Sequence, residues 1–159
     1  MDSWTLQIDY LSNHEEFVPS VALWLKEQWG FLEPATTLED MIAEFKMRFR
    51  PGGIPNAVLA LVDGRLAGTA SLIEDDMPQR PDLSPWLASV YVHPDYRCRG
   101  IAEAMINRII DEARTVGITR LYLFTFESGA YYLKRGWITL FKDTYFSKPV
   151  IVMSRDISA

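Results

Sequence analysis

Residues 92–102 combine arginines with small side chains in an order that could bind an anion. The segment has the pattern of a strand end, a tight turn and the first turn of a helix, where unpaired amides and the helix dipole attract phosphate oxygens. Gly100 and Ala102 would let a bulky pyrophosphate approach the backbone, and Arg97 and Arg99 add positive charge. A structural turn with solvated arginines fits the segment equally well, and it matches neither a Walker loop nor a dinucleotide fingerprint.

Hydrophobic periodicity places this turn inside a strand–helix–strand unit, with strands at 86–92 and 120–124 and a helix at 100–116. Such a unit normally makes a right-handed parallel crossover. Upstream, Asp63 and Gly64 suit a two-residue hairpin turn between strands at 57–62 and 65–73. An antiparallel hairpin that feeds a parallel crossover predicts an α/β fold with a mixed sheet and flanking helices.

Other patterns complete the expected order. Thr37 is a good cap for a helix, and three prolines make 74–85 a loop. The remaining expected elements are a strand at 5–11, helices at 17–30, 37–49 and 128–135, strands at 137–141 and 150–155, and a turn at 147–149. With 159 residues, we expect one domain over 1–159.

Composition excludes several functional classes. Hydrophobic residues make up 48% of the chain and the formal net charge is −5, which fits a folded protein and disfavours nucleic acid or an anionic membrane as a partner. No apolar run approaches the ~20 residues of a membrane span. Cys98 is the single cysteine and the histidines, His14 and His93, lack ligand spacing, so we expect no disulfide and no metal site. We expect a cytoplasmic location.

Two motifs together carry a family resemblance. Arg97-x-x-Gly100-x-Ala102 resembles the Q/R-x-x-G-x-G/A motif of the GNAT superfamily of N-acetyltransferases, which cradles the pyrophosphate of acetyl-CoA. Downstream, residues 131–137 resemble the family's F/L-Y-x-x-x-G-F/W segment. The close match spans 86–137, and the expected element order is similar to the family fold over nearly the whole chain. The resemblance implies a mostly antiparallel sheet with a splayed central parallel pair.

The same resemblance implies an activity and a set of site residues. Acetyl-CoA would be the cosubstrate, and its acetyl group would pass directly to a primary amine of a small molecule or peptide. The backbone of Val92 would bind the pantetheine arm, the Val90 amide would polarise the thioester carbonyl, and Tyr132 would protonate the departing thiolate. Thr125 stands where many members carry an asparagine. The implied cofactor-binding residues are Val90, Tyr91, Val92, Arg97, Cys98, Arg99, Gly100, Ile101, Ala102 and Thr125.

A base for the amine proton is missing from its usual place. Family members often carry a glutamate or histidines on the fourth strand, but Trp86 and Ala88 occupy those positions here. The nearest carboxyls are Glu74, Asp75 and Asp76, and we prefer Glu74 as the catalytic base. A solvated acidic loop, a water relay to bulk, or attraction of a cationic acceptor are the alternatives.

The missing base keeps a second function open, a non-catalytic acyl-CoA-binding sensor or interaction module. The acceptor pocket would be shaped by the first two helices and by loops 74–85 and 144–148. Among the aromatic residues in this region, we expect Trp24 and Phe45 in the core, since helical spacing favours packing. A homodimer is the default expectation if the chain self-associates. The aromatic residues considered for the wall are Trp24, Trp29, Phe31 and Phe45.

Overall fold

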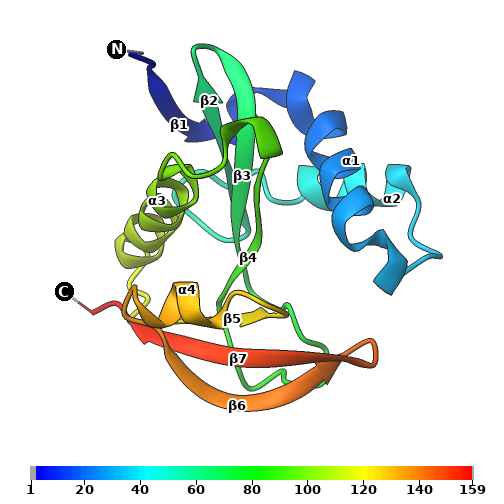
Figure 1. The fold of residues 1–159 in the computed structure, drawn as a ribbon, viewed down its shortest axis with the longest axis vertical. Helices are drawn as coiled ribbons and strands as arrows, with labels where there is room; N and C mark the ends of the chain where they lie inside the picture. Colours follow the sequence, from blue (N-terminus) through cyan, green and yellow to red (C-terminus); the bar gives the residue numbers. More distant parts are fainter. Residues whose placement is uncertain (1–2, 159) are drawn as a thin grey trace.

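The computed structural model, which describes residues 3–158, contains a seven-stranded sheet in the order β1-β2-β3-β4-β5-β7-β6 (Figure 1). Only β4 and β5 are parallel among the neighbouring strands. This arrangement confirms the mixed, mostly antiparallel α/β fold. The strands are β1 Leu6–Tyr10, β2 Asn56–Val62, β3 Arg65–Ile73, β4 Trp86–Val92, β5 Arg120–Thr125, β6 Ile138–Tyr145 and β7 Lys148–Asp156. The α-helices are α1 Val18–Trp29, α2 Leu38–Lys46, α3 Ile101–Thr115 and α4 Gly129–Leu133.

Strand β2 is apolar along nearly its whole length because helices cover both of its faces. Val58, Ala60 and Val62 pack in a cluster with the buried side of α3, whereas Ala57 and Leu59 pack with α1 and α2. Successive side chains of a strand point to opposite faces, so both sets are buried. In Figure 1, α1 and α2 accordingly lie on one side of β2–β4 and α3 lies on the other.

The parallel pair β4 and β5 is joined only at its beginning. Trp86 is paired with Tyr122, and the Tyr122 N–H donates to the Pro85 carbonyl at 3.1 Å, after which no further register pair follows. The Trp86 side chain is fully buried at this junction, and its indole N–H donates to the Leu83 carbonyl at 2.8 Å. The expected splayed pair is therefore confirmed, with Trp86 at the point where the strands meet.

A β-bulge interrupts β4 opposite β3. Ser89 and Val90 together face one residue of β3, Ala70, and Ser89 has a left-handed φ of 54°. Buried Arg48 spans this irregularity, since its Nη1 donates to the Ser71 hydroxyl at 2.9 Å and to the Ser89 hydroxyl at 3.0 Å. The guanidinium thus ties both strands together at the bulge.

The helix that leads to Arg48 begins as expected. The Asp40 N–H donates to the Thr37 hydroxyl at 3.1 Å, and the Thr37 N–H donates to the Asp40 carboxylate at 3.0 Å, which forms a capping box. The helix ends at Lys46, earlier than expected, because Phe49 already forms a β-bridge with Asn56. This early end turns the chain back toward the sheet.

The last hairpin differs from the expectation. Strand β6 extends to Tyr145 and β7 begins at Lys148, so the turn consists of Phe146 and Ser147, with φ values of 47° and 67°. The expected loop at 144–148 is mostly strand. The sequence does not indicate the longer strand, because β6 is an edge strand with partly exposed residues on both faces and so lacks a clear alternation of polar and apolar residues. It also does not indicate the turn, because neither left-handed position is a glycine.

Replacement of Arg48 tests the tie across the bulge. We expect Arg48→Met to lower the free energy of unfolding by roughly 2 kcal/mol, because the buried Ser71 hydroxyl and the partly buried Ser89 hydroxyl lose their charged donor. The measurement is urea denaturation followed by circular dichroism. Lys46→Met removes an exposed cation at the end of α2, two residues before Arg48, and is the control; it should change stability by less than about 0.5 kcal/mol. Equal effects of the two substitutions would contradict a structural role for the guanidinium.

Candidate active site

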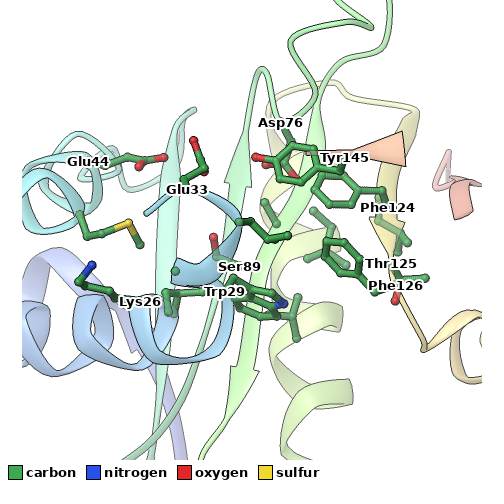
Figure 2. Close-up of a pocket in the computed structure, with 18 of the residues that line it drawn as sticks. Lys26, Trp29, Glu33, Glu44, Asp76, Ser89, Phe124, Thr125, Phe126 and Tyr145 are labelled. Carbon is green, nitrogen blue, oxygen red and sulfur yellow. The ribbon is translucent and has the colours of Figure 1, made fainter. Parts of the chain in front are cut away.

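A pocket of about 250 Å³ opens where β4 and β5 separate (Figure 2). Strand residues from β4 and β5 form its floor, and α1, α2 and the segment between them form one wall. Tyr145 of β6 and Asp76 of the loop after β3 close the far side. The charged side chains in its lining are Lys26, Glu33, Glu44, Arg48 and Asp76.

Asp76 is the carboxyl of the acidic loop that reaches this pocket. The pKa of the carboxyl is raised to about 7, chiefly by loss of water around it; the Arg48 charge opposes the rise, and the nearby Glu44 and Glu33 add to it. Glu74 and Asp75 are exposed and do not line the pocket. Figure 2 shows Asp76 beside Tyr145, with the carboxyl groups of Glu33 and Glu44 in the same half of the view. A carboxyl with such a pKa can accept and release a proton near neutral pH.

Sequence analysis missed Arg48 as a site residue. Its Nη2 donates to the Glu44 carboxylate at 2.9 Å, and its guanidinium carbon lies 4.4 Å from the centre of the Phe45 ring. In the sequence, Glu44 and Arg48 have the i,i+4 spacing of an exposed helical ion pair. Only packing of the chain against the sheet buries the cation under the pocket. Its charge is the main influence that limits the pKa rise of Asp76.

Tyr132 lines the same pocket from α4. The pKa of its phenol is raised to about 12, mainly by burial and to a smaller extent by the adjacent Tyr131. The ring packs edge-on against Trp137 at 5.9 Å between centroids. The phenol therefore holds its proton throughout the neutral range.

The end of β4 presents backbone groups to the splayed side. The His93 N–H donates to the Ala67 carbonyl of β3 at 2.8 Å. Because peptide groups alternate along a strand, those of Val92 point away from β3. The Val92 carbonyl instead accepts a hydrogen bond from the Arg97 Nε at 2.9 Å. This bond folds the arginine back on the strand end, with its guanidinium 5.7 Å from the Tyr91 ring centre.

Beyond Arg97, the chain offers a row of free amide donors. From Cys98 to Glu103, no backbone N–H has an acceptor among residues 3–158. Cys98 and Gly100 are both left-handed, with φ values of 64° and 77°, and the first helical hydrogen bond runs from the Ala104 N–H to the Gly100 carbonyl at 3.1 Å. A Cβ at Gly100 would meet nothing within 4 Å, so glycine is needed here for its φ and not for space.

The structure brings only part of the expected site into the pocket. Val90, Thr125 and Tyr132 line it, and the Thr125 hydroxyl also accepts the Ser128 N–H at 3.0 Å. Expected cofactor-binding residues that lie outside its lining are Tyr91, Val92, Arg97, Cys98, Arg99, Gly100, Ile101 and Ala102. Most of these belong to the end of β4 and the loop and first turn of α3 that continue from it.

The aromatic residues of the first helices divide between core and wall. Phe45 is buried at 1% exposure, and Trp24 packs on Tyr91 at 5.2 Å between ring centres, so neither forms the pocket lining. Trp29 lines the pocket, whereas Phe31 is exposed. The expectation of a core position is thereby confirmed for Phe45, whereas Trp24 is only partly buried and packs at the edge of the core.

Two further observations concern residues 3–158 only. No three His, Cys, Asp or Glu side chains gather there as a group able to hold a metal ion. In the same range, every helix is too short or too polar to cross a membrane.

The sequence model of the acetyltransferase (GNAT) family matches residues 18–137. An amino-acid acetyltransferase of Yersinia pestis is 39% identical over 51 residues, which is 32% of this chain and 12% of that protein. The fold is similar to that of an aminoglycoside 6'-N-acetyltransferase complexed with coenzyme A, with a TM-score of 0.74, 18% identity and 96% and 98% of the two chains covered. It is also similar to N-acetylglutamate synthase of Neisseria gonorrhoeae complexed with coenzyme A and N-acetyl-glutamate, with a TM-score of 0.69, 19% identity and 100% and 36% covered. Since the family match spans well over half of its residues, this chain belongs to the acetyltransferase (GNAT) family.

Proposed function

We propose that the chain transfers the acetyl group of acetyl-CoA directly to a primary amine of a small molecule or peptide. The observation that carries this proposal is the pairing, in one pocket, of a carboxyl with a pKa of about 7 and a phenol with a pKa of about 12. The first can accept the proton of the amine, and the second can give one to a thiolate. Both lie where β4 and β5 part.

The donor fits the free backbone groups described above. Six consecutive amides from Cys98 to Glu103 suit pyrophosphate oxygens, and the left-handed Gly100 keeps that turn open. Arg97 and Arg99 flank the turn with positive charge. The Val92 N–H is available to the pantetheine arm, since β3 does not use it, whereas the Val92 carbonyl is held by Arg97. Binding of the pyrophosphate and the pantetheine arm thus accounts for the expected cofactor-binding residues that lie outside the pocket lining.

Within the pocket, this chain's groups divide the reaction between them. Asp76 takes the proton of the acceptor ammonium, because only a neutral amine has the lone pair that attacks the thioester carbon. The Val90 N–H, at the bulge, stabilises the oxyanion. As the carbon–sulfur bond breaks, Tyr132 protonates the thiolate, and the acetyl group remains on the amine nitrogen. That nitrogen then releases its second proton, which restores the Tyr132 phenol, and Asp76 gives the first proton to solvent. Asp76 replaces Glu74 in this scheme because Glu74 is exposed outside the pocket.

The comparisons support the donor more than the acceptor. Two proteins of similar fold are described as complexed with coenzyme A. The pocket lining holds three carboxyls against two cations, Lys26 and Arg48, and this excess of acidic groups suits an acceptor that arrives as a cation. The proposal includes a single acetyltransferase domain over residues 1–159 and a cytoplasmic location, which the single cysteine favours.

Asp76→Asn tests the base. Asp76 acts as a base only when it is deprotonated. The value of kcat/KM should therefore be low at acidic pH and should rise as the pH increases through about 7. We expect the substitution to abolish this pH dependence and to lower kcat/KM roughly 10²-fold. The measurement is the pH dependence of thiol release with a cognate amine.

Two variants in the same loop serve as controls for Asp76→Asn. Asp75→Asn is the control and should leave the profile unchanged, because its carboxyl is exposed and outside the pocket. Glu74→Gln should behave like this control. If Glu74→Gln abolished the rise of kcat/KM with pH and Asp76→Asn had normal activity, the catalytic base would be Glu74 and not Asp76.

Tyr132→Phe tests the acid. The phenol is protonated at neutral pH because its pKa is about 12, so its removal should lower kcat roughly 10²-fold. The affinity for acetyl-CoA should stay within about twofold, since the ring packing is kept. Tyr131→Phe is the neighbouring control. Unchanged turnover of Tyr132→Phe would show that another group protonates the thiolate.

Binding of acetyl-CoA and its consumption separate an enzyme from a sensor. At ~100 times its dissociation constant, acetyl-CoA should stabilise the native protein by roughly 2.7 kcal/mol, visible in thermal unfolding. An amine library should then identify acceptors that release free thiol. Stabilisation without thiol release from any amine would favour the non-catalytic acyl-CoA sensor.

A further inference from the structure

One wall of the candidate active site, at the ends of β5 and β6, is aromatic. Phe124, Phe126 and Tyr145, called the aromatic wall below, line the pocket and are only partly buried. The rings of Phe124 and Tyr145 lie 4.7 Å apart between centres, with 31° between their planes. Phe126 stands edge-on to both, at angles of 83° and 71°. The hydrophobic core beside these rings therefore leaves part of their apolar surface open to the pocket.

Trp29, the last residue of α1, lines the pocket from the other side (Figure 2). Among residues 3–158, Trp29 is in no aromatic pair, whereas Phe124, Phe126 and Tyr145 pair with one another. Trp29 therefore does not close against the aromatic wall, and the space between them is open to a ligand. Exposed apolar surface that is bordered by charged groups is typical of a binding site.

The charged side chains of the lining leave one net negative charge. Arg48 is paired with Glu44 at 2.9 Å. The Lys26 ammonium donates to a backbone carbonyl at 3.0 Å. In the described part of the chain, Lys26, Glu33 and Asp76 have no ion-pair partner. With Asp76 ionised, two carboxylates therefore remain against one ammonium, and a ligand with a single positive charge would make the lining neutral.

This negative charge lies next to the aromatic wall. The pKa of the Tyr145 phenol is raised, first by burial and then by the charges of Glu33, Asp76 and Glu44, so all three carboxyls are near its ring. Figure 2 shows Asp76 beside Tyr145. A ligand in this half of the pocket would meet carboxylates at one end and aromatic rings along its length. Ring faces also attract cations, so the two features favour the same kind of ligand.

We propose that the acceptor is an arylalkylamine, a primary amine on an aromatic body with one positive charge and no carboxylate. This inference rests on the proposed function for the role of the amine as acceptor. The aromatic body packs between Trp29 and the aromatic wall, and the ammonium lies at Asp76, which takes its proton. A zwitterionic amino acid would leave the net negative charge uncompensated. An aliphatic diamine would overcompensate it and would leave the rings without a partner.

Isothermal titration compares phenethylamine with three amines that each lack one of its features. The amino acid phenylalanine adds a carboxylate, the diamine putrescine has a second charge and no ring, and cyclohexylethylamine has an aliphatic ring of similar size. CoA, which carries no acetyl group to transfer, is present throughout. We expect phenethylamine to bind roughly tenfold more tightly than phenylalanine or putrescine, and roughly threefold more tightly than cyclohexylethylamine.

Phe126→Leu tests the aromatic wall, and Glu33→Gln tests the charge. Phe126 is partly exposed and Glu33 is exposed, so both variants should fold, which thermal unfolding checks. We expect Phe126→Leu to weaken phenethylamine binding roughly tenfold and to remove the preference over cyclohexylethylamine. Glu33→Gln should weaken phenethylamine binding roughly threefold. The matched controls, Phe31→Leu and Glu39→Gln, change exposed residues outside the pocket lining and should bind like the original chain.

The proposal is wrong if phenylalanine or putrescine binds as tightly as phenethylamine, or if Phe126→Leu binds phenethylamine like the original chain. Failure of the proposed reaction would give a different result. Selective phenethylamine binding without thiol release from acetyl-CoA would keep this binding site and remove the reaction. Thiol release with another amine, without selective phenethylamine binding, would keep the reaction and remove this inference.

Discussion

The separation of β4 from β5 after the Trp86–Tyr122 pair is the constraint on which the rest of the structure depends. Two parallel strands that stayed paired would use their peptide groups on each other and would leave no space between them. Trp86 fills the point where the strands meet, and the bulge at Ser89, tied by Arg48, redirects β4 away from its neighbour. The result is a lined opening with free backbone groups along one side.

That opening also sets the proton chemistry. Removal of water raises the pKa of the Asp76 carboxyl to about 7 and that of the Tyr132 phenol to about 12. The same physical cause therefore brings the pKa of one group close to neutral pH and keeps the other group protonated. Arg48 contributes twice, because it holds the bulge and limits the pKa rise of Asp76.

Helix α3 begins with backbone amides that are free of acceptors, and side chains of its first two turns line a second pocket of about 190 Å³ beside α4. Tyr132 lines both that pocket and the pocket between β4 and β5. Gly136 is required by its left-handed φ of 90° and not by space, since a Cβ there would make only an ordinary contact of 3.5 Å with the Arg155 Nε.

Local signals in the sequence determined much of this protein: the capping box at Thr37, the Asp63–Gly64 hairpin, and the turn at 97–102 that opens α3. Each depends on backbone chemistry within a few neighbouring residues, so spacing and residue type suffice to find it. Tertiary structure alone decided that Asp76 and not Glu74 reaches the pocket, that Arg48 is buried, and that β6 continues to Tyr145. Burial and pKa depend on groups far apart in the chain, here Glu33, Glu44 and Arg48 around Asp76, and no local pattern encodes which of them will meet.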